Sequence, residues 1–162
     1  MEQRSLPQSA QNVQDYLRQR GYTYQVKELP DTTRSAEEAA RTIGCSVSQI
    51  AKSLVFKDKK TQRPVLIIAS GSNRVDLQKI THATGLELEK ADGKYVKERI
   101  GFAIGGVPPV AHQEEVIIFL DEELKKYELL WAAAGTPFSV FQLLSSDLQP
   151  LTNGKYIDLK QA

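Results

Sequence analysis

The sequence predicts a single α/β domain over residues 1–162, and three observations support this prediction. Short apolar runs of strand length alternate with segments that have helical spacing and capping residues. The 162 residues match the usual size of one domain and are enough to bury a sizeable core. No internal repeat, low-complexity tract or linker divides the chain. Hydrophobic residues make up 41% and charged residues 25%, as in an average globular protein.

The first half of the chain predicts two helices and a β-hairpin. Ser35, followed three residues later by Glu38, forms a capping box, so a helix begins there and Gly44 ends it. Two apolar runs then flank a polar turn, which is typical of a hairpin. The expected elements are, in order, a helix over 9–20 ended by Gly21, a strand over 22–29, the capped helix, a strand over 49–57, the turn at 57–64 and a strand over 65–70.

The second half alternates in the same way around one irregular segment. Val75, Leu77 and Ile80 have helical spacing, and Gly85 ends that helix. The segment "GFAIGGVPPVAH" holds three glycines and two prolines and predicts a loop. The expected elements are a helix over 74–85, a strand over 86–91, helical turns over 92–100, the loop at 101–112, a strand over 115–121, a helical turn at 122–124, a strand over 128–135 and a last helix over 138–152, before 155–159 end the chain.

Several kinds of functional site lack their residues here. His82 and His112 lie thirty residues apart without metal-ligand spacing near Cys45, so we expect no metal site. We interpret His82 as a helix-end residue and Cys45 as a small packing residue. Neither a nucleotide-binding glycine motif nor a G-x-S-x-G elbow occurs, so we expect no cofactor and no conventional serine nucleophile.

The surroundings of the protein are predicted from charge and hydropathy. The first twenty residues hold no apolar run, and no later stretch is long enough to span a membrane. A single cysteine fits a reducing compartment, so we expect a cytoplasmic protein without membrane contact. The net charge of +1 leaves nucleic-acid contacts to local cation clusters, which are equally typical of solvated surface. These clusters are Lys57, Lys59, Lys60 and Arg63, and Lys94, Lys97 and Arg99.

Lys52 is the first residue that stands out as a functional candidate. In "QIAKSLVFK", strand alternation places it on the same face as Ile50, Leu54 and Phe56, where an unpaired ammonium is costly. One interpretation is a lysine turned inward on an edge strand. The other is a lysine that faces a cavity and holds its charge for an anionic group such as a phosphate.

The second candidate is the loop "IGGVPPVAH". Gly105 and Gly106 permit unusual backbone conformations and close approach of a ligand, while Pro108 and Pro109 keep the loop extended. Exposed N–H groups on a rigid loop can stabilise an oxyanion during acyl transfer. The alternative is a tight connector between two elements.

Together these segments resemble the YbaK/ProX family of aminoacyl-tRNA deacylases, which are similar to the editing domain inserted in bacterial prolyl-tRNA synthetases. The resemblance rests on "SAEEAARTIG", "QIAKSLVF", "VLIIASGSNRVDLQKI" and "GFAIGGVPPV" in this order, followed by an apolar strand that ends in Asp121. It runs over roughly residues 20–150. It implies a mixed, mostly antiparallel β-sheet surrounded by helices, no cofactor, the 3′ acceptor end of an aminoacyl-tRNA as ligand and prolyl-tRNA synthetase as a further partner.

The resemblance also implies roles for individual residues. Lys52 matches the family's strand lysine, which contacts the 3′ end of the tRNA or the substrate, and with Gly105 and Gly106 it forms the expected catalytic set. The family's loop pattern G-x-x-x-P-x-G begins at Gly105 and has its proline at Pro109. Its last glycine falls on Ala111, a departure that an alanine tolerates if its φ is negative. The expected substrate-binding residues are Ser53, Pro109 and His112.

The activity that the resemblance implies is hydrolysis of the ester of a mischarged tRNA, carrying for example Cys or Ala on tRNA-Pro. Positioning and electrostatic stabilisation can supply much of that catalysis without a protein nucleophile. A non-catalytic module that binds tRNA or a synthetase is the alternative, which Ala111 favours. Hydrolysis of an unrelated small ester is a third interpretation. Asp121 is expected to cap the helical turn that follows it.

Overall fold

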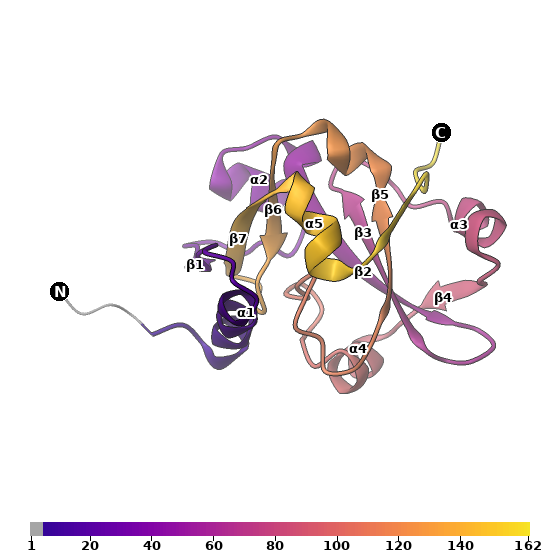
Figure 1. The fold of residues 1–162 in the computed structure, drawn as a ribbon, viewed down its shortest axis with the longest axis horizontal. Coiled ribbons are helices and arrows are strands. Elements are labelled where there is room, and N and C mark those ends of the chain that lie inside the picture. Colours follow the sequence, from indigo (N-terminus) through magenta and orange to yellow (C-terminus); the bar gives the residue numbers. More distant parts are fainter. Residues whose placement is uncertain (1–4) are drawn as a thin grey trace.

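A mixed eight-stranded sheet forms the centre of the computed structural model, which describes residues 5–162 (Figure 1). The strand order is β1-β7-β6-β2-β3-β5-β8, and β4 pairs with β2 beside this path. Within the described residues, four pairings are antiparallel (β1/β7, β2/β3, β2/β4, β6/β7) and three are parallel (β2/β6, β3/β5, β5/β8). The expected fold class, a single α/β domain with a mixed, mostly antiparallel sheet among helices, is confirmed. Residues 1–4 of the predicted span 1–162 lie outside the described part.

The elements have the following bounds. The strands are β1 (Lys27–Glu28), β2 (Ile50–Asp58), β3 (Pro64–Ser70), β4 (Leu88–Lys90), β5 (Ile117–Asp121), β6 (Leu129–Ala133), β7 (Ser139–Leu144) and β8 (Lys155–Ile157). The helices are α1 (Gln8–Gln19), α2 (Ala36–Ile43), α3 (Leu77–Thr84), α4 (Gly93–Arg99) and α5 (Ser145–Thr152), with the 3₁₀ helices η1 (Val47–Gln49) and η2 (Glu122–Lys126).

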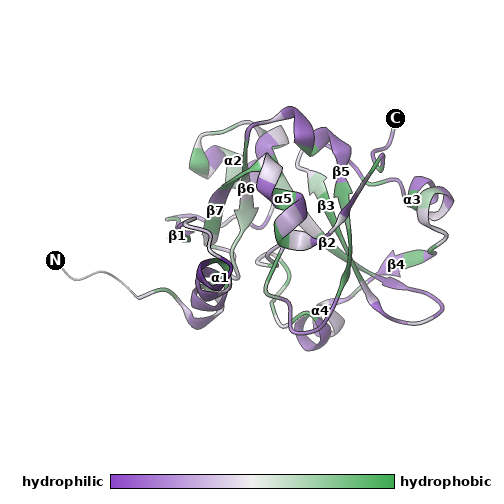
Figure 2. Ribbon diagram, viewed as in Figure 1, coloured by the Kyte–Doolittle hydropathy of each residue, from purple (hydrophilic) through white to green (hydrophobic). Residues whose placement is uncertain are grey.

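Both faces of the sheet are covered, and β3 lies in its buried centre. Leu66 and Ile68 pack into the cluster formed with α1, α4 and α5, whereas Val65, Ile67 and Ala69 pack toward α3. Helix α2 packs on Ile50 on the same side as α3. Figure 2 shows the apolar strands inside a polar outline. In the described residues, no helix combines the length and the hydropathy that crossing a membrane requires.

Most expected elements are confirmed, including the hairpin of β2 and β3 and the end of α1 before Gly21. Ser35 caps α2 as expected, because its side chain accepts a hydrogen bond from the Glu38 N–H. The capping box is only half formed, since the Glu38 carboxylate accepts instead from the Thr32 hydroxyl. Helix α3 begins only after Asp76, which caps it, so its predicted start at residue 74 is too early.

Two predicted elements are wrong in type or extent. The last helix was expected from residue 138, but Ser139–Leu144 is strand β7, which pairs with both β6 and β1. The strand expected over 22–29 shrinks to the two residues of β1. The reason is the buried Gln14 of α1: its side chain accepts from the Val26 N–H and donates to the Tyr24 carbonyl, replacing a partner strand.

Candidate active site

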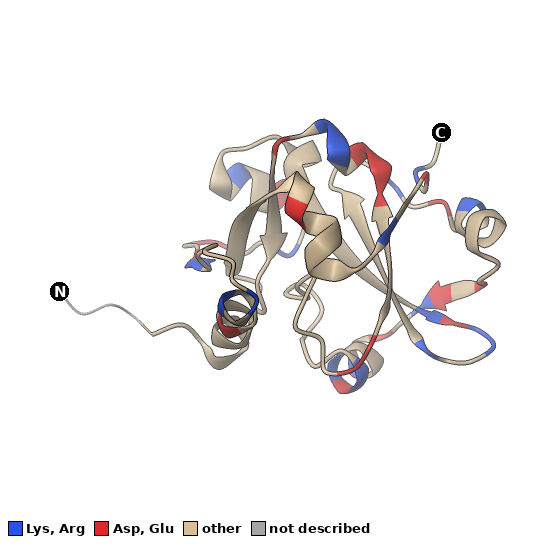
Figure 3. Ribbon diagram, in the orientation of Figure 1, with Lys and Arg blue, Asp and Glu red and all other residues tan. Residues whose placement is uncertain are grey.

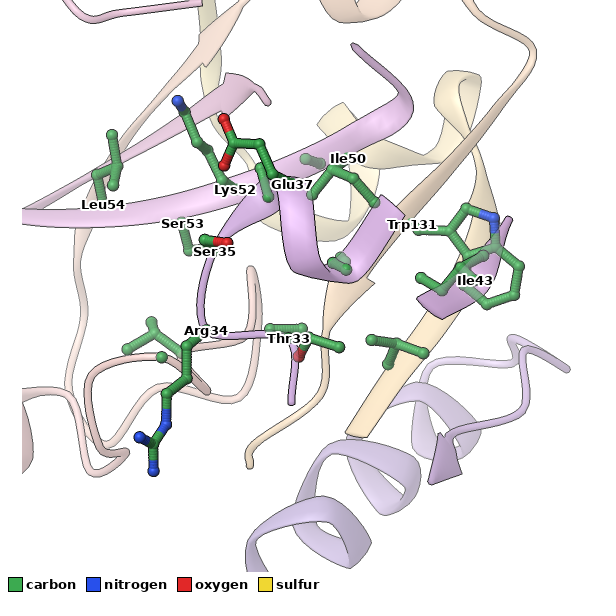
Figure 4. A pocket seen from close by; sticks show the side chains of 18 of the residues that line it. Thr33, Arg34, Ser35, Glu37, Ile43, Ile50, Lys52, Ser53, Leu54 and Trp131 are labelled. Carbon is green, nitrogen blue, oxygen red and sulfur yellow. The ribbon is translucent and has the colours of Figure 1, made fainter. Parts of the chain in front are cut away.

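A cavity of about 320 Å³ opens where the sheet is interrupted beside β2. β2 pairs with β3 along most of its length, but its other edge pairs with β6 only at Ile50 and Ala51 and with β4 only from Phe56 to Asp58. Among the described residues, no strand covers this edge over 52–55. Side chains and backbone of the segment before α2, of α2, β2, β6 and β7, and of the loop at 104–107 surround the resulting space (Figure 4).

Lys52 lines this cavity, and its ammonium group is held by backbone carbonyls. The Lys52 Nζ donates to the Asn73 carbonyl at 2.7 Å and to the Gly71 carbonyl at 3.3 Å. β2 is a central strand of the sheet, but at Lys52 it pairs only with β3, so this lysine lies beside the open part of the other edge. Partial burial lowers the pKa of the Lys52 ammonium, and the carboxylates of Glu37 and Asp121 act in the opposite direction.

Asp121 holds the segment that positions Lys52. Its buried carboxylate accepts from the Ser70 N–H at 3.0 Å and from the Asn73 side-chain amide at 2.8 Å. The other carboxylate oxygen accepts from the Glu123 N–H, so the expected capping of the turn is confirmed. Asp121 therefore fixes both ends of the short turn whose carbonyls bind the Lys52 ammonium.

Ser53 presents unused hydrogen-bonding capacity at the open edge. Its hydroxyl is inaccessible to solvent and has no partner among residues 5–162. Successive residues of a strand direct their N–H and C=O groups to opposite edges. The Ile50 carbonyl and the Asp58 N–H point toward the β3 side, so the even-numbered residues of β2 direct their backbone groups to β3. The odd-numbered residues, Ser53 among them, direct theirs to the opposite edge, and at Ser53 this edge is the gap between β6 and β4. Ser53 therefore brings a hydroxyl and a backbone edge to the cavity, and each lacks a protein partner.

The two adjacent glycines of the loop do different work. Gly105 has φ +93° and is the third residue of a turn closed by the Gly106 N–H and the Ala103 carbonyl at 3.1 Å. At Gly106 a Cβ would lie 2.7 Å from backbone atoms of Thr136, so only glycine fits. The amides of Gly105 and Val107, which both line the cavity, donate to no other described residue.

The remaining residues of the expected loop site lie behind the cavity. Pro109 is buried and His112 partly buried, and neither lines the cavity. The His112 Nε2 donates to the Pro108 carbonyl at 2.7 Å, which braces the loop, and burial lowers the pKa of this imidazole. Ala111 has φ +67°, so the condition of a negative φ is not met and the alanine adopts a conformation that favours glycine. The substrate contacts of Pro109 and His112 stay predictions.

Sequence reasoning missed several cavity residues. Glu37 lies beside Lys52, Arg34 extends from the segment before α2, and Trp131 and Ile43 form an apolar side (Figure 4). Arg34 packs near Gly105, where a Cβ would lie 3.4 Å from its Cγ. His82 lies in the last turn of α3 and Cys45 packs beside α2, as expected. In the described part of the chain, His, Cys, Asp and Glu side chains form no group of three that would hold a metal ion.

Comparison with known proteins places this chain in a family. The family model of the aminoacyl-tRNA editing domain matches residues 30–151. A crystal structure of a candidate trans-editing enzyme for prolyl-tRNA synthetase is 45% identical and has a TM-score of 0.91, covering 98% of this chain and 100% of that one. The uncharacterized Bacillus subtilis protein YwhH is 33% identical over 93% of this chain and 96% of its own. The candidate Cys-tRNA(Pro)/Cys-tRNA(Cys) deacylase EbsC of Enterococcus faecalis is 29% identical over 77% and 76%. The chain belongs to the aminoacyl-tRNA editing domain family.

Proposed function

We propose that this protein hydrolyses the ester bond between a small amino acid and the 3′ end of a mischarged tRNA, acting in trans. Cys or Ala on tRNA-Pro are substrates of this kind, and prolyl-tRNA synthetase is the partner whose errors it would correct. The observation that carries the proposal is one cavity lined both by Lys52, whose ammonium is held by backbone carbonyls, and by Ser53, whose hydroxyl has no partner among the described residues. Membership of the aminoacyl-tRNA editing domain family and the similarity to EbsC, a candidate Cys-tRNA(Pro)/Cys-tRNA(Cys) deacylase, support it.

Each cavity group has a role in this proposal. The Lys52 ammonium attracts an anionic group of the nucleotide or the developing negative charge of the ester. Ser53 forms a hydrogen bond with the substrate, because an unpaired buried hydroxyl costs the fold about 1–3 kcal/mol until a partner arrives. The free amides of Gly105 and Val107 stabilise the oxyanion.

The chemistry needs no protein nucleophile. Ser53 has no hydrogen-bonded base among the described residues, so its hydroxyl is not activated for attack. A water molecule, or a hydroxyl of the substrate itself, adds to the ester carbonyl. The carbon–oxygen bond to the ribose then breaks, and with water as the nucleophile the products are the free amino acid and the free ribose hydroxyl. The protein contributes positioning and electrostatic stabilisation.

The dimensions of the cavity favour a small amino acid. Its volume of about 320 Å³ lies near the lower limit of ligand pockets. Ile43, Ile50 and Trp131 give it an apolar side, which discriminates weakly against one additional methylene group. We therefore propose that several small aminoacyl esters are accepted, with larger side chains excluded by contact.

Ala111 adopts a positive φ of 67°, a conformation that glycine reaches more easily than alanine. The loop therefore has a glycine-type conformation at this position although the residue is alanine. The catalytic loop and the cavity are thus compatible with hydrolysis despite the departure from the loop pattern.

The test is a deacylation assay with purified protein and tRNA charged with Cys, Ala, Ser, Thr or Pro. We expect release of at least one small amino acid well above the uncatalysed rate. Retained tRNA binding without deacylation of any species would contradict the enzymatic proposal.

Two variants separate catalysis from folding. Lys52→Met keeps the aliphatic stem and removes the charge, and we expect deacylation to fall at least 100-fold. Ser53→Ala removes an unsatisfied hydroxyl, so we expect unchanged or higher stability but slower deacylation. Lys125→Met, at an exposed position outside the cavity, is the matched control. If Ser53→Ala loses stability and keeps full activity, the hydroxyl is structural and its proposed role is wrong.

A further inference from the structure

The positive charge of the chain is concentrated in two short segments. Residues 57–63 hold four cations and one anion, and residues 90–99 hold four cations and two anions. These segments therefore carry net charges of +3 and +2, whereas the whole chain carries +1. The remainder of the chain is thus net −4, which makes the two segments a strongly positive exception.

The fold brings these segments together into one surface. The Tyr95 hydroxyl of α4 donates to the Gln62 carbonyl at 2.7 Å, and Arg99 donates to the same carbonyl at 3.3 Å. The Lys57 ammonium lies 5.3 Å from the centre of the Tyr95 ring. β4 pairs with the hairpin end of β2 and brings Lys90 to the same region. Figure 3 shows blue segments on the hairpin, β4 and α4 at neighbouring positions.

Six of these eight cations form no ion pair within the described residues. Arg99 pairs with Glu114 and Lys57 with Glu89. The other six are exposed and form no ion pair with the rest of residues 5–162. We call them the basic surface: Lys59, Lys60, Arg63, Lys90, Lys94 and Lys97.

The basic surface adjoins the mouth of the cavity. Ile104, which lines the cavity and is 58% exposed, reaches the start of α4, where a Cβ on Gly93 would lie 3.7 Å from its Cδ1. β2 itself runs from the cavity to the hairpin. From Ser53 to Asp58 it covers five residues, or about 17 Å at roughly 3.3 Å per residue.

We infer that the basic surface binds backbone phosphates of the same RNA whose 3′ end enters the cavity. This inference rests on the proposed function. Separated, exposed cations suit phosphates along a strand, which need charge and no fixed geometry. The surface therefore contributes affinity without reading sequence, and the choice of substrate stays with the cavity.

The test compares two double variants with the same change in charge. Lys94→Gln/Lys97→Gln alters exposed positions one turn apart on α4 and keeps a good helix former at each. Lys125→Gln/Lys155→Gln is the control, on η2 and on β8 at the far end of the sheet. Binding of an uncharged tRNA-Pro transcript is measured by fluorescence anisotropy between 50 and 200 mM KCl. Using the uncharged transcript makes the result independent of hydrolysis.

For the α4 variant we expect the slope of log Kd against log[KCl] to become shallower by roughly 1.5, since each lost phosphate contact removes about 0.7–0.9. Equivalently, the loss of affinity between about 50 and 200 mM salt becomes about eightfold smaller. The control variant keeps the wild-type slope. Equal slopes for all three proteins would overturn the inference, and so would an equal decrease in both variants.

Deacylation data separate this inference from the proposed function. If wild-type protein hydrolyses neither aminoacyl-tRNA nor the matching 3′-aminoacyl adenosine, the proposed function fails whatever the slopes are. If wild type hydrolyses both, the α4 variant is expected to lower the ratio of kcat/KM for the tRNA ester to that for the adenosine ester, through a higher KM. An unchanged ratio would contradict the inferred role of the basic surface and would leave the proposed function intact.

Discussion

Replacing each of the two adjacent glycines by alanine tests the loop geometry. At Gly106 a Cβ would lie 2.7 Å from the Thr136 backbone, which has no flexible end that yields. To admit the methyl group, the loop at Gly106 and the backbone at Thr136 would have to move apart, and such overpacking costs about 1–3 kcal/mol of stability. It also weakens the hydrogen bond from the Gly135 N–H to the Gly106 carbonyl, now 2.9 Å, at about 0.5–1.5 kcal/mol. Alanine also lowers the conformational entropy of the unfolded chain, which stabilises the folded protein by about 0.4–1 kcal/mol. We therefore expect Gly106→Ala to lower the free energy of unfolding by roughly 2–3 kcal/mol.

Gly105→Ala is the matched comparison, and its cost has a different origin. Its φ of +93° costs alanine about 1–2 kcal/mol. The nearest atom to a new Cβ is the Arg34 Cγ at 3.4 Å, on a flexible side chain. The same reduction in the entropy of the unfolded chain offsets part of this cost, so we expect Gly105→Ala to lower the free energy of unfolding by roughly 0.5–1 kcal/mol. The glycine with the unusual φ is therefore expected to be the less critical of the two for stability.

Urea denaturation and thermal unfolding measure this order directly. A difference of about 2 kcal/mol corresponds to roughly 4–8 °C in Tm for a chain of this length. If Gly105→Ala destabilises the protein as much as or more than Gly106→Ala, the close approach to Thr136 does not control the loop.

Three further predictions concern the cavity. Asp121→Asn is expected to lower stability by about 1–3 kcal/mol and to slow deacylation, because it disturbs the turn that holds Lys52; wild-type values in urea unfolding and deacylation would contradict this. Burial lowers the pKa of Lys52 below 10.5, and the proposed role needs the charged form. The catalysed rate, corrected for spontaneous hydrolysis, is therefore expected to fall as the pH rises through this lowered pKa. A rate that stays constant up to pH 10.5 would exclude a role for the charge. Ile43→Ala enlarges the apolar side, so the rate for a larger ester relative to the alanyl ester should rise about tenfold, and an unchanged ratio would remove Ile43 from the specificity pocket.

The position of Lys52 was predictable because strand alternation is a local property. The same is true of the helix cap at Ser35, which needs only four residues to be recognised. The reason for Gly106 was not visible in the sequence, since the backbone that excludes a side chain there belongs to Thr136, thirty residues later. The sequence marked the loop as unusual, and only the fold separates the role of one glycine from that of its neighbour.

Long-range pairing explains the errors in secondary structure as well. The predicted last helix began at residue 138 and so included Ser139–Leu144, although partners on both sides, β6 and β1, make that segment a strand. At 22–26 the opposite occurred, because one side chain, Gln14, satisfied the backbone and no strand was needed. In both places the sequence pattern was compatible with two structures, and contacts from distant elements decided between them.

The contacts of Lys52 show how a partly buried lysine remains available to a ligand. An ammonium group has three donors, and two of them bind the neutral carbonyls of Gly71 and Asn73. Among the described residues no carboxylate pairs with it directly, since Asp121 gives its oxygens to N–H donors of its own turn and of the next. The side chain is therefore held in place before the substrate arrives, and the third N–H donor and the positive charge remain available to the substrate. Holding a lysine by carbonyls rather than by a carboxylate keeps it both ordered and electrostatically active, as the proposed role in ester hydrolysis requires.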